Sequence, residues 1–349
     1  MCGNHPSNKG GMTSVINQIM GHDWEKEGVS ITFIPTYMPG SKGKTIAYFM
    51  LAYVKVFMTL LFRRPDVFYT HMSVKGSFAR TKALHRLCRL FRVKDIIHLH
   101  GSEFEQWYRS VTPEKQLEIR SLVEDCGLFI VLGQKWERFM RSIAPQANIV
   151  QLANSVRIPA QTATWHDDPV RFLYMGVLIP RKGVRDLLEA VKMLVESDTI
   201  GRIHVDIAGT GSEEAALKQY AEEQGLTSSV SFLGWVAGEE KDAIIRRSNV
   251  LVLPSYNEGL PVAILEAMSY GLPVVSTRVG DIADVIIEDE NGYLVNPGEV
   301  RCLAEKMLRC ADASAWNRLS VNARQRIEEK FNIDRFYSEL AILWKRVAP

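Results

Sequence analysis

Two series of short apolar segments, with helical patterns between many of them, run through the chain. The first series comprises residues 30–37, 66–72, 95–100, 128–133 and 148–154, and the second comprises residues 170–176, 203–209, 230–236, 249–255 and 273–277. Apolar strands that alternate with helices are typical of parallel sheets covered on both faces. Two such series in succession predict an α/β fold with two Rossmann-like, doubly wound domains.

A polar segment, residues 155–169, separates the two series. Two domains also suit the length of 349 residues, because a single hydrophobic core stops growing at roughly 250–300 residues. We therefore expect one Rossmann-like domain at residues 1–155 and a second at residues 156–330. A C-terminal helix at residues 331–349 is expected to pack back across the domains.

A glycine-rich segment, HPSNKGGM at residues 5–12, lies close to the first residue of the chain. Such a loop normally follows a strand, but MCGN is shorter than the roughly five or six residues of a usual strand. We expect the first strand of the N-terminal domain to be short or missing, or the natural chain to begin upstream. Gly10 and Gly11 let a ligand approach the backbone, whose N–H groups can donate to a phosphate or a sugar. The alternative is a plain surface turn.

Two glutamates with seven residues between them, Glu258 and Glu266, flank the start of a short apolar helix. Pro261 suits the first position of this helix, and Gly271 is placed to end it. The free backbone N–H groups at a helix start attract phosphate. One carboxylate on each side of this anion site would suit a diphosphate ligand with hydroxyls at both ends. The alternative is a capping acid and a helical acid that faces solvent.

Three further motifs are HLHGSEF at residues 98–104, GVLIPRKGV at 176–184 and AGTGSE at 208–213. His100 ends a predicted strand at the edge where ligands bind in open α/β sheets, so its ring would point toward a ligand. The alternative is a packed or solvated histidine, and His98 on the same face is a weaker candidate. In the second motif, Lys182 offers a compact positive charge for a pyrophosphate.

Together these motifs and residues 8–12 resemble the family 4 glycosyltransferases, which are retaining enzymes of the GT-B fold. The resemblance spans nearly the whole chain and is most specific in the two glutamates and the AMSYGLPVVST that follows the second one. It implies two Rossmann-like domains that face each other across a cleft. The C-terminal domain would hold a UDP- or GDP-linked sugar and the N-terminal domain a sugar or lipid-linked acceptor. Neither a cofactor nor a metal is implied.

The resemblance also implies a role for each site residue. Three residues would be catalytic. His100 would contact the donor sugar and Glu258 its hydroxyls, while Lys182 would stabilise the leaving diphosphate. The donor would also be held by Gly10, Gly11, Arg181, Lys182, Gly259, Leu260, Val262 and Glu266, the last of which contacts the ribose. The acceptor would attack on the face from which the nucleotide leaves, with the diphosphate as base.

One position departs from the family pattern. Val177 stands where the family has an arginine directly after the glycine of the motif. This either weakens the diphosphate site or shifts the task to Arg181, whose guanidinium could bind phosphate in bidentate fashion.

Three other functions are alternatives for a chain of this pattern. A nucleotide-sugar epimerase or hydrolase of similar fold would convert the donor without an acceptor, and a non-catalytic binding subunit would explain Val177. A Rossmann dehydrogenase is disfavoured because no G-x-G-x-x-G follows an N-terminal strand with an acid about 20 residues further on. We expect a glycosyltransferase of bacterial surface polysaccharide or lipid-linked oligosaccharide synthesis.

The charge of the chain is unevenly divided. Residues 1–155 carry 20 Lys and Arg against 12 Asp and Glu, while the remainder is net acidic. Residues 42–94 carry 12 basic residues and a single acid, Asp66, which favours an anionic partner. Nucleic acid is disfavoured because no zinc, helix-turn-helix or aromatic-ladder signature accompanies the cations.

The basic region contains two helical segments that bear on membranes. Residues 45–62 are largely apolar and are charged only at Lys55, which would cost about 2.5–3.5 kcal/mol near the middle of a membrane span. We therefore expect a buried core helix whose Lys55 reaches outward. Residues 80–94 predict a basic amphipathic helix. This helix either lies on an anionic leaflet or simply turns its basic face to water.

The expected location is the cytoplasm, at the inner face of the plasma membrane. The polar start of the chain lacks the apolar region of a secretory signal. No CxxC pair occurs, which predicts free thiols in a reducing compartment. The five cysteines are Cys2, Cys88, Cys126, Cys302 and Cys310.

Overall fold

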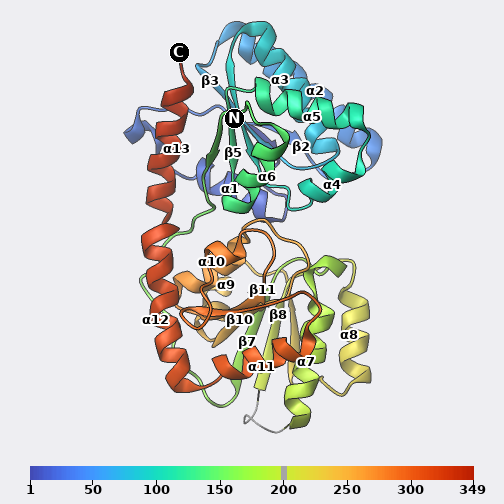
Figure 1. The fold of residues 1–349 in the computed structure, drawn as a ribbon, viewed down its shortest axis with the longest axis vertical. Helices are drawn as coiled ribbons and strands as arrows, with labels where there is room; N and C mark the ends of the chain where they lie inside the picture. The colour runs from blue at the N-terminus through green and yellow to red at the C-terminus, as the bar shows by residue number, and fades with distance from the viewer. Residues whose placement is uncertain (198–202) are drawn as a thin grey trace. The chain divides into compact units, whose positions relative to one another are not determined.

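The computed structural model describes residues 1–197 and 203–349, which form two compact units (Figure 1). Unit 1 contains Met1–Asn154 and Asp334–Pro349, and unit 2 contains Ser155–Ile333. Each unit is built on one six-stranded sheet whose neighbouring strands run parallel. The prediction of an α/β fold with two doubly wound sheets is confirmed.

Unit 1 has the strand order β2-β1-β3-β4-β5-β6. Its strands are β1 (Cys2–Asn4), β2 (Ile34–Tyr37), β3 (Val67–Met72), β4 (Lys94–Leu99), β5 (Leu128–Val131) and β6 (Ile149–Gln151). Its helices are α1 (Gly11–Met20), α2 (Lys42–Phe62), α3 (Gly76–Phe91), α4 (Phe104–Ser110), α5 (Pro113–Asp125), α6 (Gln134–Ile143) and α13 (Ile333–Val347), with a short 3₁₀ helix at Trp24–Glu27.

The first strand of unit 1 is short but present. β1 has three residues, and Cys2 pairs with Ile34 of β2 on one side and Thr70 of β3 on the other. Of the two alternatives expected from the sequence, a short strand and a missing one, the structure has the short strand. A strand held from both sides, with Cys2 fully buried, persists at a length that a sequence pattern does not reveal.

The C-terminal helix α13 packs on unit 1 through aromatic side chains. The Tyr337 hydroxyl donates to the Gln18 carbonyl at 3.0 Å, and its ring stacks on His22 at 3.9 Å between centroids. Trp344 lies 4.6 Å from Trp24 and 5.4 Å from Tyr69 between ring centroids. These contacts make residues after Ile333 part of the unit 1 core.

Helix α2 departs most from expectation. Only Ala52, Val56 and Leu60 are buried along its length, so the prediction of a buried core helix is wrong. The helix is apolar around its circumference but packs by one face only. By length and composition, it is long and apolar enough to cross a membrane. Its exposed large apolar side chains are Ile46, Met50, Leu51, Val54, Met58, Leu61 and Phe62.

Unit 2 has the strand order β12-β11-β10-β7-β8-β9. Its strands are β7 (Val170–Met175), β8 (Ile203–Ala208), β9 (Val230–Gly234), β10 (Val250–Leu253), β11 (Val274–Thr277) and β12 (Gly292–Val295). Its helices are α7 (Val184–Ser197), α8 (Glu214–Glu223), α9 (Gly238–Arg246), α10 (Val262–Ser269), α11 (Val300–Cys310) and α12 (Ala313–Lys330), with 3₁₀ helices at Pro180–Lys182 and Ile282–Asp284.

The strand order of unit 2 reverses at β7. This strand pairs with β8 on one side and with β10 on the other. Ligands of open α/β sheets bind beyond the carboxyl ends of the strands at such a switch point. The loops that follow β7, β8 and β10 therefore define where a site in this unit is expected.

Candidate functional site

The loops after β7 and β10 are tied to each other at the switch point of unit 2. Nη1 of Arg181 donates to the Asn257 carbonyl at 2.9 Å. In return, the backbone N–H of Tyr256 donates to the Arg181 carbonyl at 2.7 Å. Because its guanidinium is engaged with backbone, Arg181 joins the loop that carries Lys182 to the loop that carries Glu258.

Glycines allow the loops to approach this closely. Gly183 has φ 66°, and a Cβ there would lie 2.1 Å from the Pro254 carbonyl oxygen after β10. A Cβ at Gly209 would lie 1.8 Å from the Gly176 carbonyl oxygen after β7. The glycines of the second and third motifs thus let three loops from adjacent strands pack backbone against backbone.

Glu258 and Lys182 form a buried ion pair in this loop cluster. The Glu258 carboxylate, only 7% exposed, accepts from Nζ of Lys182. The same carboxylate oxygen accepts from the Ser255 hydroxyl at 2.8 Å. A buried carboxylate is stable only when it is paired and hydrogen-bonded. The sequence pattern identified Glu258 and Lys182 but not Ser255, because a serine between a strand and a loop carries no distinctive signal.

Tyr174 lies close to the same cluster. Its hydroxyl donates to the Val177 carbonyl at 3.2 Å. Burial, and after it the charge of Glu258, raises the pKa of Tyr174. The phenol therefore stays protonated and holds Val177 through its backbone.

Glu266 has a different partner. It lies in α10, half-buried, and its Oε1 accepts from Nζ of Lys241 in α9 at 2.6 Å. Within residues 1–197 and 203–349, no hydrogen bond joins Glu266 to Lys182 or Glu258. The two glutamates therefore flank the start of α10, and each is balanced by its own lysine. No sequence pattern indicates Lys241.

Helix α10 begins between the two glutamates. Val262 is its first residue, and Pro261 is the residue before it rather than the first helical one. Gly271 has φ 84° and follows the end of the helix, as the sequence indicated. The first N–H groups of a helix have no partner within it, so Val262 is placed to offer a donor, whereas Gly259 and Leu260 lie in the loop before the helix.

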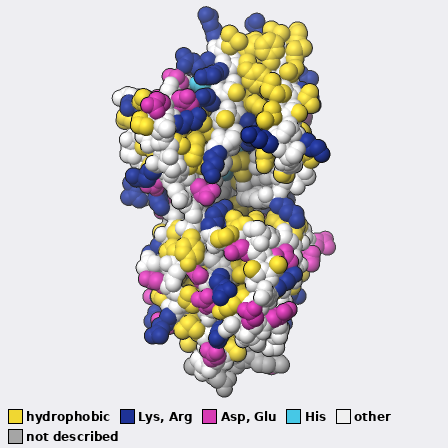
Figure 2. Space-filling model, turned by 90° about the vertical axis from the view of Figure 1, so that its right-hand side faces the viewer, with side chains coloured by type: hydrophobic (Ala, Val, Ile, Leu, Met, Phe, Trp, Pro, Cys, Tyr) yellow, Lys and Arg dark blue, Asp and Glu magenta, His cyan; other side chains and the backbone are white. Residues whose placement is uncertain are grey.

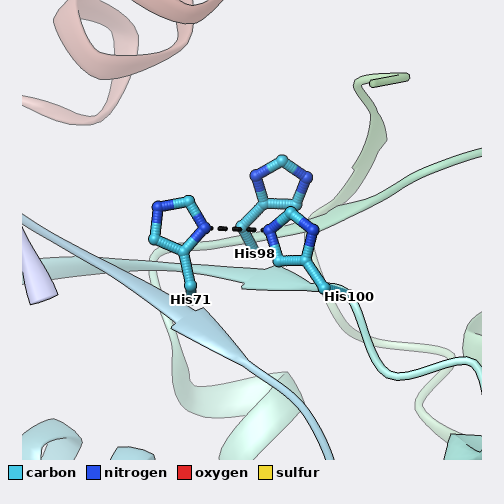
Figure 3. A group of neighbouring side chains, drawn as sticks. All are labelled: His71, His98 and His100. Atoms are coloured by element: carbon cyan, nitrogen blue, oxygen red, sulfur yellow. Dashed lines mark hydrogen bonds between the residues drawn. The ribbon is translucent and has the colours of Figure 1, made fainter. Parts of the chain in front are cut away.

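Unit 1 contains a cluster of three histidines at the carboxyl ends of β3 and β4 (Figure 3). His71 pairs in register with His98, and His100 lies one residue beyond β4. Nδ1 of His71 and Nε2 of His100 are hydrogen-bonded at 2.8 Å. The rings of His98 and His100 lie 4.1 Å apart. Nδ1 of His98 is bonded to the Tyr69 hydroxyl at 2.6 Å.

Burial keeps these imidazoles uncharged. It lowers the pKa of His100 to about 3, and it lowers the pKa values of His71 and His98 well below 6.5. A neutral imidazole has one donor and one acceptor nitrogen. Nε2 of His71 and Nε2 of His98 are buried without a hydrogen-bond partner in the described part of the chain. The cluster thus retains unused capacity to bond a polar ligand.

The same nitrogens bear on metal binding. One nitrogen from each of His71, His98 and His100 lies within 4.8 Å of the others, and imidazole is a common ligand of zinc. However, His71 and His100 already bond to each other through one nitrogen each. His98 is bonded to Tyr69 instead, so a metal that used the nitrogens of the His71–His100 bond would have to displace that bond. His71 could have been found from the sequence as a histidine near the end of a strand next to that of His100.

Gly10 and Gly11 lie where β1 leads into α1. Gly10 has φ 132° and precedes the first residue of the helix, Gly11. A Cβ at either position would meet no atom within 4 Å. The space beside this loop is therefore open, and its role in binding stays a prediction.

Comparison with known proteins assigns the second half of the chain. Residues 160–329 match the family described as Glycosyl transferases group 1. The chain is 26% identical over 294 residues to the amylovoran biosynthesis glycosyltransferase AmsK of Erwinia amylovora, covering 81% of this chain and 70% of that protein. It is 25% identical over 328 residues to the UDP-Gal:alpha-D-GlcNAc-diphosphoundecaprenol alpha-1,3-galactosyltransferase of Escherichia coli, covering 89% and 82%.

Solved structures support the fold. The sucrose-phosphate synthase of Thermosynechococcus elongatus has a TM-score of 0.80 at 18% identity and covers 99% of this chain and 98% of its own. HepE of Anabaena has a TM-score of 0.78 at 17% identity, with the same coverage. The predicted GT-B fold is confirmed. The sequence similarity is to the Glycosyl transferases group 1 family over residues 160–329, and the relatives in sequence named above are glycosyltransferases.

Proposed function

We propose that this protein is a retaining glycosyltransferase that moves a sugar from a nucleotide-sugar to an acceptor hydroxyl. The observation that carries the proposal is the buried Lys182–Glu258 pair at the switch point of unit 2. A lysine beside a helix start suits a diphosphate, and a carboxylate beside it suits sugar hydroxyls. Glu266 then binds the ribose from the other side of the helix start.

The reaction breaks the bond between the anomeric carbon and the diphosphate oxygen and forms one to the acceptor oxygen. The acceptor's proton passes to the leaving diphosphate, which is on the face that the acceptor attacks. Charge grows on the diphosphate as the bond breaks. Lys182 and the N–H groups of Gly259, Leu260 and Val262 stabilise this charge, with no metal or cofactor required.

Unit 1 is proposed to bind the acceptor, and it also holds His100. The neutral ring of His100 can hydrogen-bond a sugar hydroxyl, and the partnered ring of His71 fixes its orientation. Gly10 and Gly11 offer backbone donors beside open space.

The acceptor is proposed to be lipid-linked. One relative is named for a diphosphoundecaprenol acceptor and another for amylovoran synthesis. We infer a role in bacterial surface polysaccharide or lipid-linked oligosaccharide assembly on the cytoplasmic side of the membrane. The donor is UDP- or GDP-linked. HepE was solved with UDP and with UDP-glucose, which favours UDP.

Calorimetry with UDP and GDP, followed by transfer assays with the corresponding sugars, tests the proposal. We expect one nucleotide to bind and its sugar to be transferred to a diphosphoundecaprenol-linked acceptor with retained anomeric configuration, in the presence of EDTA. Binding without transfer to any acceptor would favour a non-catalytic subunit. Rapid conversion of the donor alone would favour an epimerase or hydrolase. Failure of both nucleotides to bind at millimolar concentration would refute a donor-dependent function.

A further inference from the structure

The outward face of α2 is an apolar stripe open to solvent. Val54 is 55% exposed and Leu51 is 67% exposed. Exposed apolar residues recur at spacings of three and four, which places them on one side of a helix. The space-filling view shows a broad apolar patch on unit 1 with Lys and Arg side chains along its margin (Figure 2). The stripe comprises Met50, Leu51, Val54, Met58, Leu61 and Phe62.

The opposite face of α2 is already used. Val56 and Leu60 are fully buried in a cluster with Phe68 of β3 and Leu84 of α3. The rings of Phe57 and Phe91 meet edge to face at 5.4 Å and join α2 to α3. A helix that is apolar on all sides is normally covered on all sides. An exposed patch of this kind marks an interaction surface.

Exposed cations accompany the stripe. Lys55 lies one residue after Val54 and so about 100° around the helix, at the margin of the stripe. On α3, Lys82 and Arg89 pair with Glu118 and Asp125. Nine further cations on or beside α2 and α3 are exposed and form no ion pair with an acid among the described residues. They are Lys42, Lys44, Lys55, Arg63, Arg64, Lys75, Arg86, Arg92 and Lys94.

We propose that the outward face of α2 docks on an anionic lipid leaflet. An apolar stripe with cations around it enters the boundary between headgroups and acyl chains while its cations meet lipid phosphates. The helix lies in the interface and does not span, because Val56 and Leu60 would have to leave the core of unit 1. This docking does not rest on the reaction proposed for the protein.

A second copy of the chain fits this face less well. A symmetric dimer brings the same patch of each subunit together. The unpaired cations around α2 of the two subunits would then face and repel each other. Residues 42–94 hold a single acid, Asp66, to offset them. A leaflet with anionic headgroups instead supplies the opposite charge along the whole margin.

Vesicle flotation of the full chain is the direct test. We expect flotation with vesicles of phosphatidylcholine and phosphatidylglycerol, and little with phosphatidylcholine alone. Binding is expected to fall steeply in about 1 M salt, where the screening length is about 3 Å. The proposal is overturned if the protein floats equally with both vesicle types. It is also overturned if the bound protein resists extraction by salt and alkali, as a protein with a spanning helix would.

Variants assign the binding to α2. Leu51→Gln with Met58→Gln is expected to reduce the floated fraction about tenfold, because the buried apolar area is lost. Lys44→Gln with Arg64→Gln is expected to reduce it on anionic vesicles only. The matched control is Leu117→Gln with Val321→Gln, since these residues are 65% and 66% exposed on α5 and α12. Unchanged flotation of the α2 variants, with unchanged thermal unfolding, overturns the proposal.

Insertion is read directly with an environment-sensitive dye. In a Cys302→Ser background, Val54→Cys is labelled; the other four cysteines are buried. A blue shift on anionic vesicles is expected at position 54 and not at a control Val321→Cys. Light scattering at increasing protein concentration completes the test by measuring whether the chain dimerises. If it does, and if Leu51→Gln with Met58→Gln abolishes the dimer, this face binds a second copy and the proposal is overturned.

Discussion

His71 and His100 are joined by a hydrogen bond of 2.8 Å between Nδ1 and Nε2, from neighbouring strands of one sheet. In the proposed reaction His100 contacts the donor sugar, and His71 would act on that sugar only through this bond. Since burial keeps both rings neutral, the bond orients His100 without giving it a charge. His71 is therefore a positioning residue.

Replacement of His71 should reduce turnover more than donor binding. His71→Phe removes the bond to His100, and we expect kcat to fall about tenfold, because one such bond is worth about 1 kcal/mol. His71→Asn, which can still bond His100, should recover part of the rate. Steady-state kinetics with both variants checks this, and equal rates for wild type and His71→Phe would remove the assignment.

The histidine cluster also predicts how stability depends on pH. The unfolded chain binds a proton at each histidine below about pH 6.5, whereas the folded His100 does so only near its pKa of about 3. The free energy of unfolding therefore has its full value above about pH 6.5. It falls as the pH drops toward 3, by up to about 1.4 kcal/mol per pH unit for each buried histidine.

Urea unfolding at several pH values measures this slope. His98→Gln removes one of the three buried rings while it keeps a polar group near Tyr69, so its stability should fall less steeply between about pH 6.5 and pH 4. His166→Gln, at an exposed position, serves as the control and should leave the slope unchanged. The same slope in His98→Gln as in wild type would show that His98 is not held neutral by the fold.

The Lys182–Glu258 pair predicts linked effects on activity and stability. Lys182→Ala should lower the rate by at least roughly a hundredfold, since it removes a charge that stabilises the leaving group. It also leaves the Glu258 carboxylate buried with Ser255 alone, and such a loss costs about 3–5 kcal/mol. Lys182→Met with Glu258→Gln should regain stability but not activity.

Thermal unfolding and transfer assays on the same preparations separate the two effects. Lys218→Ala is the matched control, because Lys218 pairs with Glu214 on the exposed surface of α8. It should change neither quantity. Wild-type rates in Lys182→Ala would refute the role of this lysine.

Sequence patterns predicted the fold better than the partners within the site. All ten apolar segments are strands, since period and length alone identify buried parallel strands. The pattern leaves β1 as either short or missing, because three residues carry too little pattern. The burial of α2 is predicted wrongly, because composition cannot tell a covered apolar face from an exposed one. Ser255 and Lys241 became visible only in three dimensions, because their roles depend on contacts between loops and helices distant in sequence.

The close approach of Gly209 to Gly176 gives a prediction about stability. Gly209→Ala places a Cβ 1.8 Å from the Gly176 carbonyl oxygen, so backbone must move, at a cost of about 1–3 kcal/mol or more. Gly225→Ala is the control for positive φ alone, because a Cβ there meets no atom within 4 Å. Chemical denaturation of both variants should show the larger loss at Gly209, and a smaller loss there would contradict the packing role of this glycine.

The pairing of Glu266 with Lys241 leads to the last prediction. If Glu266 holds the ribose of the donor, Glu266→Gln weakens ground-state and transition-state binding alike, so KM should rise about tenfold with kcat little changed. Lys241→Met frees the carboxylate without removing it, and its KM should change less than that of Glu266→Gln. The carboxylate is partly exposed, so neither change should disturb folding much. A fall in kcat at constant KM for Glu266→Gln would instead place this side chain at the reacting sugar, because only an interaction made in the transition state affects turnover alone.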